Sequence, residues 1–180
     1  MNSYFQKMKG GEKSPPMTSF SNIFWSFIGA FSGISFLHYT PFGHLTTLDI
    51  NMVIGSFGAS AVLVYGAIES PLAQPRNLIG GHILSAIVGV FCFQLCAPIG
   101  MWFAGALAVA GAIAIMHLTK TLHPPGGATA LIAVIGSPQL HDIGYLYAVV
   151  PVARGAFILL VVSLIVNNIP KNRKYPKCWW

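Results

Sequence analysis

Long apolar runs alternate with short polar segments along the chain, and six of the runs are candidates for crossing a membrane. The predicted spans cover residues 20–37, 50–68, 78–97, 101–118, 125–136 and 145–169. Since a helix needs about 20 apolar residues to cross the bilayer, we interpret four runs as full spans and two as short or broken helices. The pattern predicts an all-α membrane protein, a compact bundle in a single transmembrane domain over residues 20–169.

Two of the predicted helices carry breaks. Gly55, Ser56 and Gly58 interrupt the second run. The fifth run is short, and at 1.5 Å per residue its helix reaches about 18 Å, less than the ~30 Å hydrocarbon core. The missing depth has to come from non-helical chain, which a membrane tolerates only where protein buries it or where it lines a water-filled cavity. The segment 123–127 is therefore expected beside a cavity.

The same two helices carry a trace of internal duplication. Gly58–Ala61 reads Gly-Ala-Ser-Ala and Gly127–Ala130 reads Gly-Ala-Thr-Ala, and the offset of 69 residues also pairs Ser56 with Pro125. Three spans per copy is an odd number, so the two copies would be inverted relative to each other. Inverted repeats with broken helices build the central binding site of many transporters. The predicted halves are residues 20–98 and 99–169.

Composition and charge support the membrane class. The chain is 54% hydrophobic and 8% charged, whereas soluble domains are about 25% charged. Most of the net charge of +6 lies in two basic tails, residues 1–19 and 170–180. With both termini in the cytoplasm of a bacterial inner membrane, every Lys and Arg outside the membrane falls in a cytoplasmic segment. These tails are expected to contact anionic lipid, and a nucleic-acid partner has little support.

The most specific string runs from residue 123 to residue 130 and reads His-Pro-Pro-Gly-Gly-Ala-Thr-Ala. Pro124 disfavours the helical region for the histidine before it, and Pro125 suits the first turn of a helix. The two glycines that follow leave backbone N–H groups uncovered, and Thr129 adds a hydroxyl. Such a helix start is an anion site; the alternative is a capped helix that simply follows a rigid turn.

The break in the second span would aim a second helix start at the midplane, with the hydroxyls of Ser56 and Ser60; close packing of small residues is the alternative. Arg154 lies well inside the last span, where a charge is costly and usually functional. It would supply a fixed positive charge, or it pairs with an acid or caps carbonyls freed by Pro151. The acids considered are Glu69, Asp49 and Asp142. The predicted anion-binding residues are Arg154, His123, Pro124, Pro125, Gly126, Gly127, Thr129, Ser56, Gly58 and Ser60.

Three histidines are candidates for gating the path of the anion or for carrying a coupled proton. His82 and His117 are candidates beside His123, and Arg76 is a candidate for collecting anions at the mouth. A histidine that titrates near neutral pH could couple a proton to a weakly basic anion, although packing is the alternative role for His82. The histidines lack the spacing and the carboxylates of a metal site, and no nucleophile–base pair or phosphate loop is visible. We therefore expect no metal, no cofactor and no enzymatic activity.

The string 123–130, together with Pro71–Asn77 and Gly80–His82, resembles the HPP family of small integral membrane proteins. The resemblance covers about residues 20–168. It implies a family commonly described with four spans, in which some members in plastids and cyanobacteria are implicated in nitrite transport. Some members also carry a CBS regulatory module, for which this chain is too short.

The expected function is a transporter or channel for a small inorganic anion, with nitrite as the first guess by resemblance. One alternative is a metal-binding or enzymatic membrane protein that uses His82, His117 and His123. Another is a non-transporting membrane subunit. The expected partners are the anion and the lipid bilayer, and a homo-oligomer is possible.

Overall fold

The computed structural model describes residues 3–8, 14–43 and 45–180, and every regular element within these ranges is helical. The elements are α1 (Ser3–Lys7), α2 (Phe20–His38), α3 (Thr47–Ala61), the π-helical η1 (Val62–Gly66), the 3₁₀ turn η2 (Pro71–Ala73), α4 (Pro75–Cys96), α5 (Met101–Leu118), α6 (Pro125–Ile135), α7 (Pro138–Asp142), the π-helical η3 (Ala148–Ala153) and α8 (Arg154–Val166). The predicted all-α class is confirmed. Lys9 and Lys13 of the predicted N-terminal basic tail lie outside the described residues.

Five of the described segments are long and apolar enough to cross a membrane: α2, α3 with η1, α4, α5, and η3 with α8. α6 is the shorter apolar helix, with 11 residues. The interruption predicted at Gly55, Ser56 and Gly58 is wrong, because α3 is continuous from Thr47 to Ala61. A helix absorbs a glycine at a cost of about 1 kcal/mol, and a capping box between Thr46 and Asp49 starts this one firmly.

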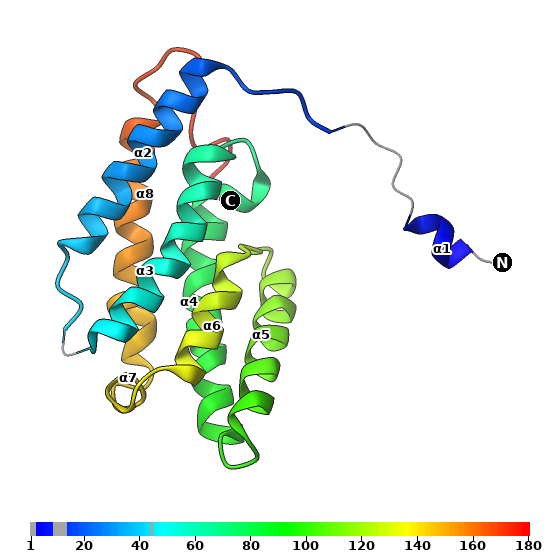
Figure 1. The fold of residues 1–180 in the computed structure, drawn as a ribbon, viewed down its shortest axis with the longest axis vertical. Coiled ribbons are helices and arrows are strands. Elements are labelled where there is room, and N and C mark those ends of the chain that lie inside the picture. The colour runs from blue at the N-terminus through cyan, green and yellow to red at the C-terminus, as the bar shows by residue number, and fades with distance from the viewer. Residues whose placement is uncertain (1–2, 9–13, 44) are drawn as a thin grey trace.

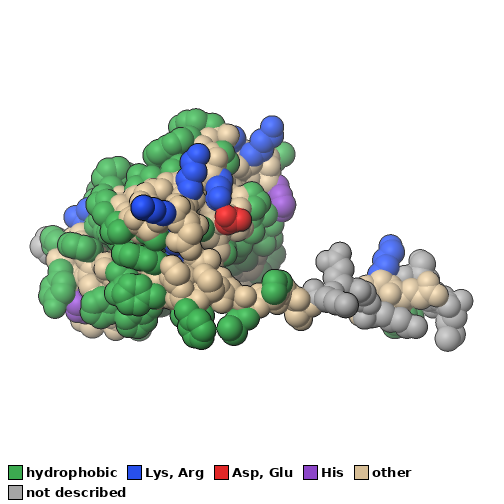
Figure 2. All heavy atoms as spheres, turned by 90° about the horizontal axis from the view of Figure 1, so that it is seen from above, with side chains coloured by type: hydrophobic (Ala, Val, Ile, Leu, Met, Phe, Trp, Pro, Cys, Tyr) green, Lys and Arg blue, Asp and Glu red, His purple; other side chains and the backbone are tan. Residues whose placement is uncertain are grey.

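Figure 1 shows α4 in the middle of the bundle, with α5 and α6 on one side of it and α2, α3 and α8 on the other. The start of α2, the α3–α4 turn and the C-terminal residues lie at the upper end, which we call the terminal face. The α4–α5 turn and α7 lie at the opposite end, the distal face. Figure 2 looks onto the terminal face and shows Lys and Arg side chains gathered there among hydrophobic ones.

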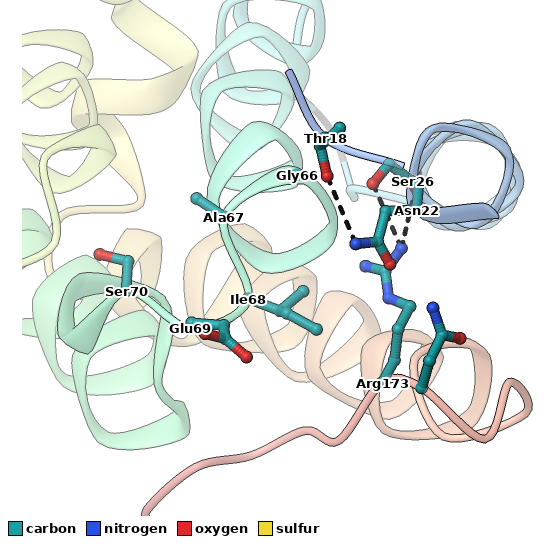
Figure 3. A pocket seen from close by; sticks show the side chains of 10 residues that line it. Thr18, Asn22, Ser26, Gly66, Ala67, Ile68, Glu69, Ser70 and Arg173 are labelled. Carbon is teal, nitrogen blue, oxygen red and sulfur yellow. Dashed lines mark hydrogen bonds between the residues drawn. The ribbon is translucent and has the colours of Figure 1, made fainter. Parts of the chain in front are cut away.

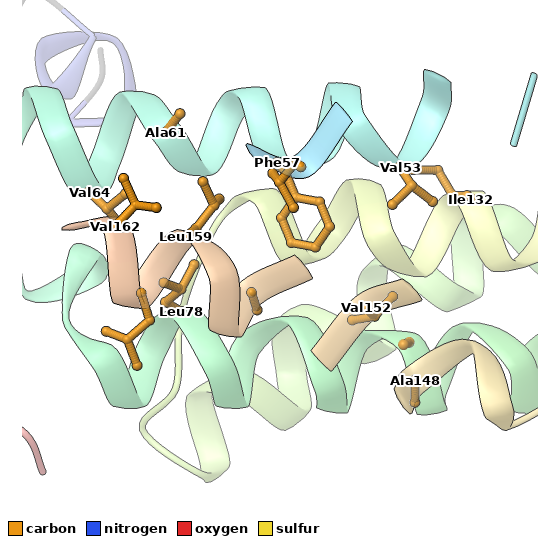
Figure 4. Packing of buried hydrophobic residues seen from close by; sticks show 14 of the residues in the cluster. Val53, Phe57, Ala61, Val64, Leu78, Ile132, Ala148, Val152, Leu159 and Val162 are labelled. Atoms are coloured by element: carbon orange, nitrogen blue, oxygen red, sulfur yellow. The ribbon is translucent and has the colours of Figure 1, made fainter. Parts of the chain in front are cut away.

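The two sides of the bundle pack differently. Small residues bring α6 close to α4: Gly89 lies against Ala130 and Ala133, and Gly126 lies against Ser85. Such contacts are typical of helices that pack closely in membranes. On the other side, larger side chains fill the space between α3, α4 and α8, as Figure 4 shows. The close approach of α6 to α4 is what sets the position of the polar residues described next.

Candidate functional site

Five of the predicted site residues meet in one buried, hydrogen-bonded group, which we call the histidine network. Its members are Ser56 and Ser60 of α3, His82 of α4, His123 just before α6, and Thr129 of α6. Each of these residues is at most 4% exposed. The network therefore joins three helices through side chains in the interior of the bundle.

The hydroxyl of Ser60 lies between the two imidazole rings. Its Oγ is 2.7 Å from His82 Nε2 and 2.9 Å from His123 Nε2. The other ring nitrogen of His82, Nδ1, lies 2.7 Å from Thr129 Oγ1. Thr129 Oγ1 in turn lies 3.0 Å from Ser56 Oγ. The polar atoms thus form a continuous chain from α3 through both histidines to α6.

One contact determines which atoms donate and which accept along this series of hydrogen bonds. The carbonyl oxygen of Leu72 lies 2.8 Å from His123 Nδ1 and can only accept, so Nδ1 carries a proton. A neutral His123 then accepts at Nε2 from the Ser60 hydroxyl. Ser60 accepts from the Nε2–H of His82, whose Nδ1 accepts from the Thr129 hydroxyl. With both rings neutral, one arrangement of protons satisfies every ring nitrogen.

The start of α6 differs from the predicted anion site. The N–H of Gly126 donates to the His123 carbonyl at 2.8 Å, and the N–H of Gly127 donates to the Pro124 carbonyl at 3.0 Å. The prediction that these N–H groups are uncovered is wrong, because tight turn bonds satisfy them. The matching prediction of a helix start at Ser56 is also wrong, since that hydroxyl lies in the middle of the continuous α3.

Arg154, the first residue of α8, lies apart from the network. Its guanidinium carbon is 5.6 Å from the centroid of the Phe42 ring, a cation–π contact. Its Nε and Nη2 atoms are buried and have no hydrogen-bond partner within the described part of the chain. The predicted alternative partner Asp49 is engaged elsewhere, because its carboxylate accepts from Thr46 and from Ser137. Within the described residues, Arg154 forms no salt bridge with Asp49 or with the other two acids considered, Glu69 and Asp142.

The remaining predicted residues also lie outside the network or at its edge. His117 is exposed on the last turn of α5. Arg76 Nη2 donates to the Thr119 carbonyl at 2.5 Å and so ties α4 to the end of α5. Gly58 lines a groove between α2 and α3. The carbonyl of Pro125 accepts from Ser56 at 3.0 Å, and Pro124 is exposed.

Three neighbours of the network were not predicted. The ring of Phe57 lies 4.8 Å from the His82 ring, centroid to centroid, and packs against Gly155. The Tyr147 hydroxyl donates to the Thr129 carbonyl at 3.1 Å. An aromatic residue within an apolar run has no sequence signal that separates such a role from ordinary core packing. Nothing in the sequence indicates that the backbone carbonyl of Leu72 contacts a histidine.

The network offers hydroxyl and imidazole groups as hydrogen-bond donors and proton carriers. Within the described ranges, no three His, Cys, Asp or Glu side chains lie close enough together to hold a metal ion. The hydroxyl and imidazole groups of the network can form hydrogen bonds to a ligand and can pass protons from one member to the next.

The fold and this buried network define a multi-pass helical membrane protein. The family model for the HPP transmembrane region matches residues 15–176, and the chain belongs to this family. Two transmembrane proteins of Dictyostelium discoideum are similar to it. One is 48% identical over 98% of this chain and 57% of its own length, and the other is 42% identical over 98% and 63%. The chain thus spans less than two thirds of these relatives, and no solved structure matches it.

Proposed function

We propose that the chain moves a small inorganic anion across the membrane, with nitrite as the first candidate, and that it performs no enzymatic reaction. The observation that carries the proposal is the histidine network. Polar and ionisable side chains inside a membrane bundle are costly and usually mark a pathway for substrate or protons. Here such side chains come from three helices and converge at one point.

The network is a closed gate in this proposal, because its donors are used by its own members. When α6 moves away from α3 and α4, the hydroxyls of Ser60 and Thr129 and the N–H of His82 become free to bind an anion. Rocking of one half of a bundle against the other is how many carriers alternate access. The proton chain through His123 would couple or relay protons during this step.

Arg154 is a second anion-binding position on the proposed route, nearer the distal face. Its buried and unpartnered nitrogens favour an anion as the missing partner. Phe57 lies between Arg154 and the histidine network, since its ring touches both His82 and Gly155, the neighbour of Arg154. The proposed path therefore passes from Arg154, past Phe57, to the histidine network.

The inverted repeat and the membrane location belong to the same proposal. Residues 56 and 125, paired by the repeat offset, contact each other through Ser56 Oγ and the Pro125 carbonyl. Residues that lie on a two-fold axis contact their own counterparts, which supports an inverted arrangement. Both termini are proposed to be cytoplasmic. A bacterial inner membrane remains a prediction, and the two relatives named above come from an amoeba.

The test is nitrite uptake into proteoliposomes that hold the purified chain, at about pH 6 and about pH 8. The variants are Arg154→Ala and His82→Leu, with the exposed His117→Gln as the matched control. Each of the first two is expected to lower the flux about tenfold or more, while the control keeps it. No flux above empty liposomes at either pH contradicts nitrite transport, and equal flux in all variants contradicts the proposed route.

A second candidate function, a membrane subunit that does not transport, is favoured by the closed packing of the network. A Ser60→Cys chain in which Cys92, Cys96 and Cys178 are replaced separates the two. A water-soluble maleimide reaches this thiol during turnover if the network opens. Protection of the thiol under every condition, in a protein that is folded and inserted, supports the subunit.

A further inference from the structure

A polar cavity of about 380 Å³ opens at the terminal face, away from the histidine network. Thr18, Asn22 and Ser26 line one side of it, the turn 66–70 lines another, and Arg173 reaches in from the C-terminal residues. Figure 3 shows the guanidinium group next to Asn22 and Ser26. In this cavity a buried cation, Arg173, meets an open polar space.

Arg173 is held by four hydrogen bonds, and all of its acceptors are uncharged. Its Nη1 donates to the Asn22 carbonyl at 3.1 Å and to Ser26 Oγ at 3.3 Å. Its Nη2 donates to the Tyr65 carbonyl at 2.6 Å and to Asn167 Oδ1 at 2.8 Å. The residue is 8% exposed, and within the described residues its Nε has no partner. Four of the five N–H donors of the guanidinium have acceptors, but none of these acceptors carries a negative charge.

The acid on the cavity lining does not pair with Arg173. Glu69 also lines the cavity, but its carboxylate is paired with Lys177 at 2.8 Å. Burial lowers the pKa of Arg173 from its usual value, which reflects the cost of keeping a charge there. A guanidinium nevertheless stays protonated in proteins. The cavity therefore keeps one uncompensated positive charge, in a lining of hydroxyl and amide groups.

We propose that this cavity binds a phosphate group, carried either by an anionic lipid headgroup or by a soluble phosphate, with Arg173 as its cationic partner. The positive charge of the guanidinium attracts a phosphate group, and its Nε–H is the one donor that no described residue uses. The hydroxyls of Thr18 and Ser70 are additional donors on the lining. The exposed ring of Phe20 lies in the first turn of α2, two residues after Thr18, so an apolar side chain that could enter a bilayer borders the cavity.

The test uses the full chain in detergent micelles, with calorimetric titration of short-chain phosphatidic acid and, separately, of inorganic phosphate. Arg173→Gln removes four hydrogen bonds together with the charge, so a loss of binding in that variant would not separate the two causes. Ala67→Glu instead places a carboxylate on the cavity lining and leaves the Arg173 contacts in place. Ala67→Gln is the matched neutral variant, and Lys174→Gln removes an exposed charge outside the lining.

Ala67→Glu is expected to weaken binding about tenfold or more, because a carboxylate on the lining repels the phosphate and offsets the charge of Arg173. Ala67→Gln and Lys174→Gln should stay within about twofold of the parent chain. Binding of inorganic phosphate identifies a soluble ligand, and binding of phosphatidic acid alone identifies a lipid headgroup. The proposal is overturned if neither probe binds, if Ala67→Glu binds as tightly as the parent, or if Lys174→Gln loses as much. Nitrite flux is measured separately, so the two proposals fail independently.

Discussion

The histidine network and the Arg173 cavity are both buried polar groups, and they differ in how their charges and protons balance. In the network, neutral partners satisfy one another, and each ring nitrogen has a contact of 2.9 Å or less. At Arg173, a cation faces four neutral acceptors and keeps one donor without a partner among the described residues. A complete network makes the interior rigid, whereas an incomplete one needs an explanation such as a ligand.

The two regions share the turn between α3 and α4. The Leu72 carbonyl binds His123, and the next carbonyl, of Ala73, accepts from the Tyr175 hydroxyl at 2.7 Å. Burial raises the pKa of Tyr175 to about 12, so its hydroxyl is protonated and donates. The C-terminal residues, predicted as a basic tail, therefore pack on the turn that anchors the network. A change at one region can reach the other through this turn.

The largest expected effect comes from breaking the complete network. Ser60→Ala removes the hydroxyl that satisfies the Nε2 atoms of both His82 and His123. Leaving two buried nitrogens without partners is expected to cost about 3 kcal/mol of stability. The apparent free energy of unfolding, measured by titration with sodium dodecyl sulfate from mixed micelles, gives this value.

The matched control is Ser163→Ala. Ser163 is also fully buried on a spanning helix, but it does not touch the network: its hydroxyl donates to the Leu160 carbonyl of its own helix at 2.8 Å and contacts the Tyr175 hydroxyl. Its loss is expected to cost no more than about 1 kcal/mol. Equal costs for the two serines would mean that the network contributes no more than an ordinary helix contact.

A smaller effect is expected at the incomplete site, although more hydrogen bonds are lost there. Arg173→Gln removes four bonds, but it also removes a buried charge whose desolvation opposes folding. The expected cost is about 1–2 kcal/mol without added phosphate, measured in the same titration. A cost above that of Ser60→Ala would show that the charge is already balanced in the folded chain and would weaken the phosphate proposal.

Much of the fold was predictable because apolar run length alone marks a membrane helix. The error at α3 arose because Gly55 and Gly58 were interpreted as a break. Their cost of about 1 kcal/mol each is small beside the packing that holds α3 between its neighbours. Tertiary contacts decided that question, and no local pattern contains them.

The candidate site was predictable where motif residues carry it. His82, His123 and Thr129 stood out by type and by neighbouring glycines and prolines, and they do meet. Arg173 did not stand out, because an arginine in a basic segment usually lies in solvent. Its burial depends on a bond to the Tyr65 carbonyl, 108 residues away in the chain. The open helix start was mispredicted because turn bonds that use the backbone donors cannot be read from residue types.

The smallest expected effect concerns the exposed salt bridge between Glu69 and Lys177 at the edge of the Arg173 cavity. The hydrogen bond from Lys177, and then its charge, lower the pKa of Glu69 below 4.5. A lowered carboxylate pKa stabilises the fold above pH 4.5, and this contribution is lost as the pH falls through the lowered pKa. Glu69→Gln should therefore lower the thermal midpoint slightly above pH 4.5 and leave it unchanged well below. The same variant removes the one acid on the cavity lining, so phosphate should bind more tightly to it. Weaker binding would mean that the Glu69–Lys177 pair shapes the site rather than opposing the anion.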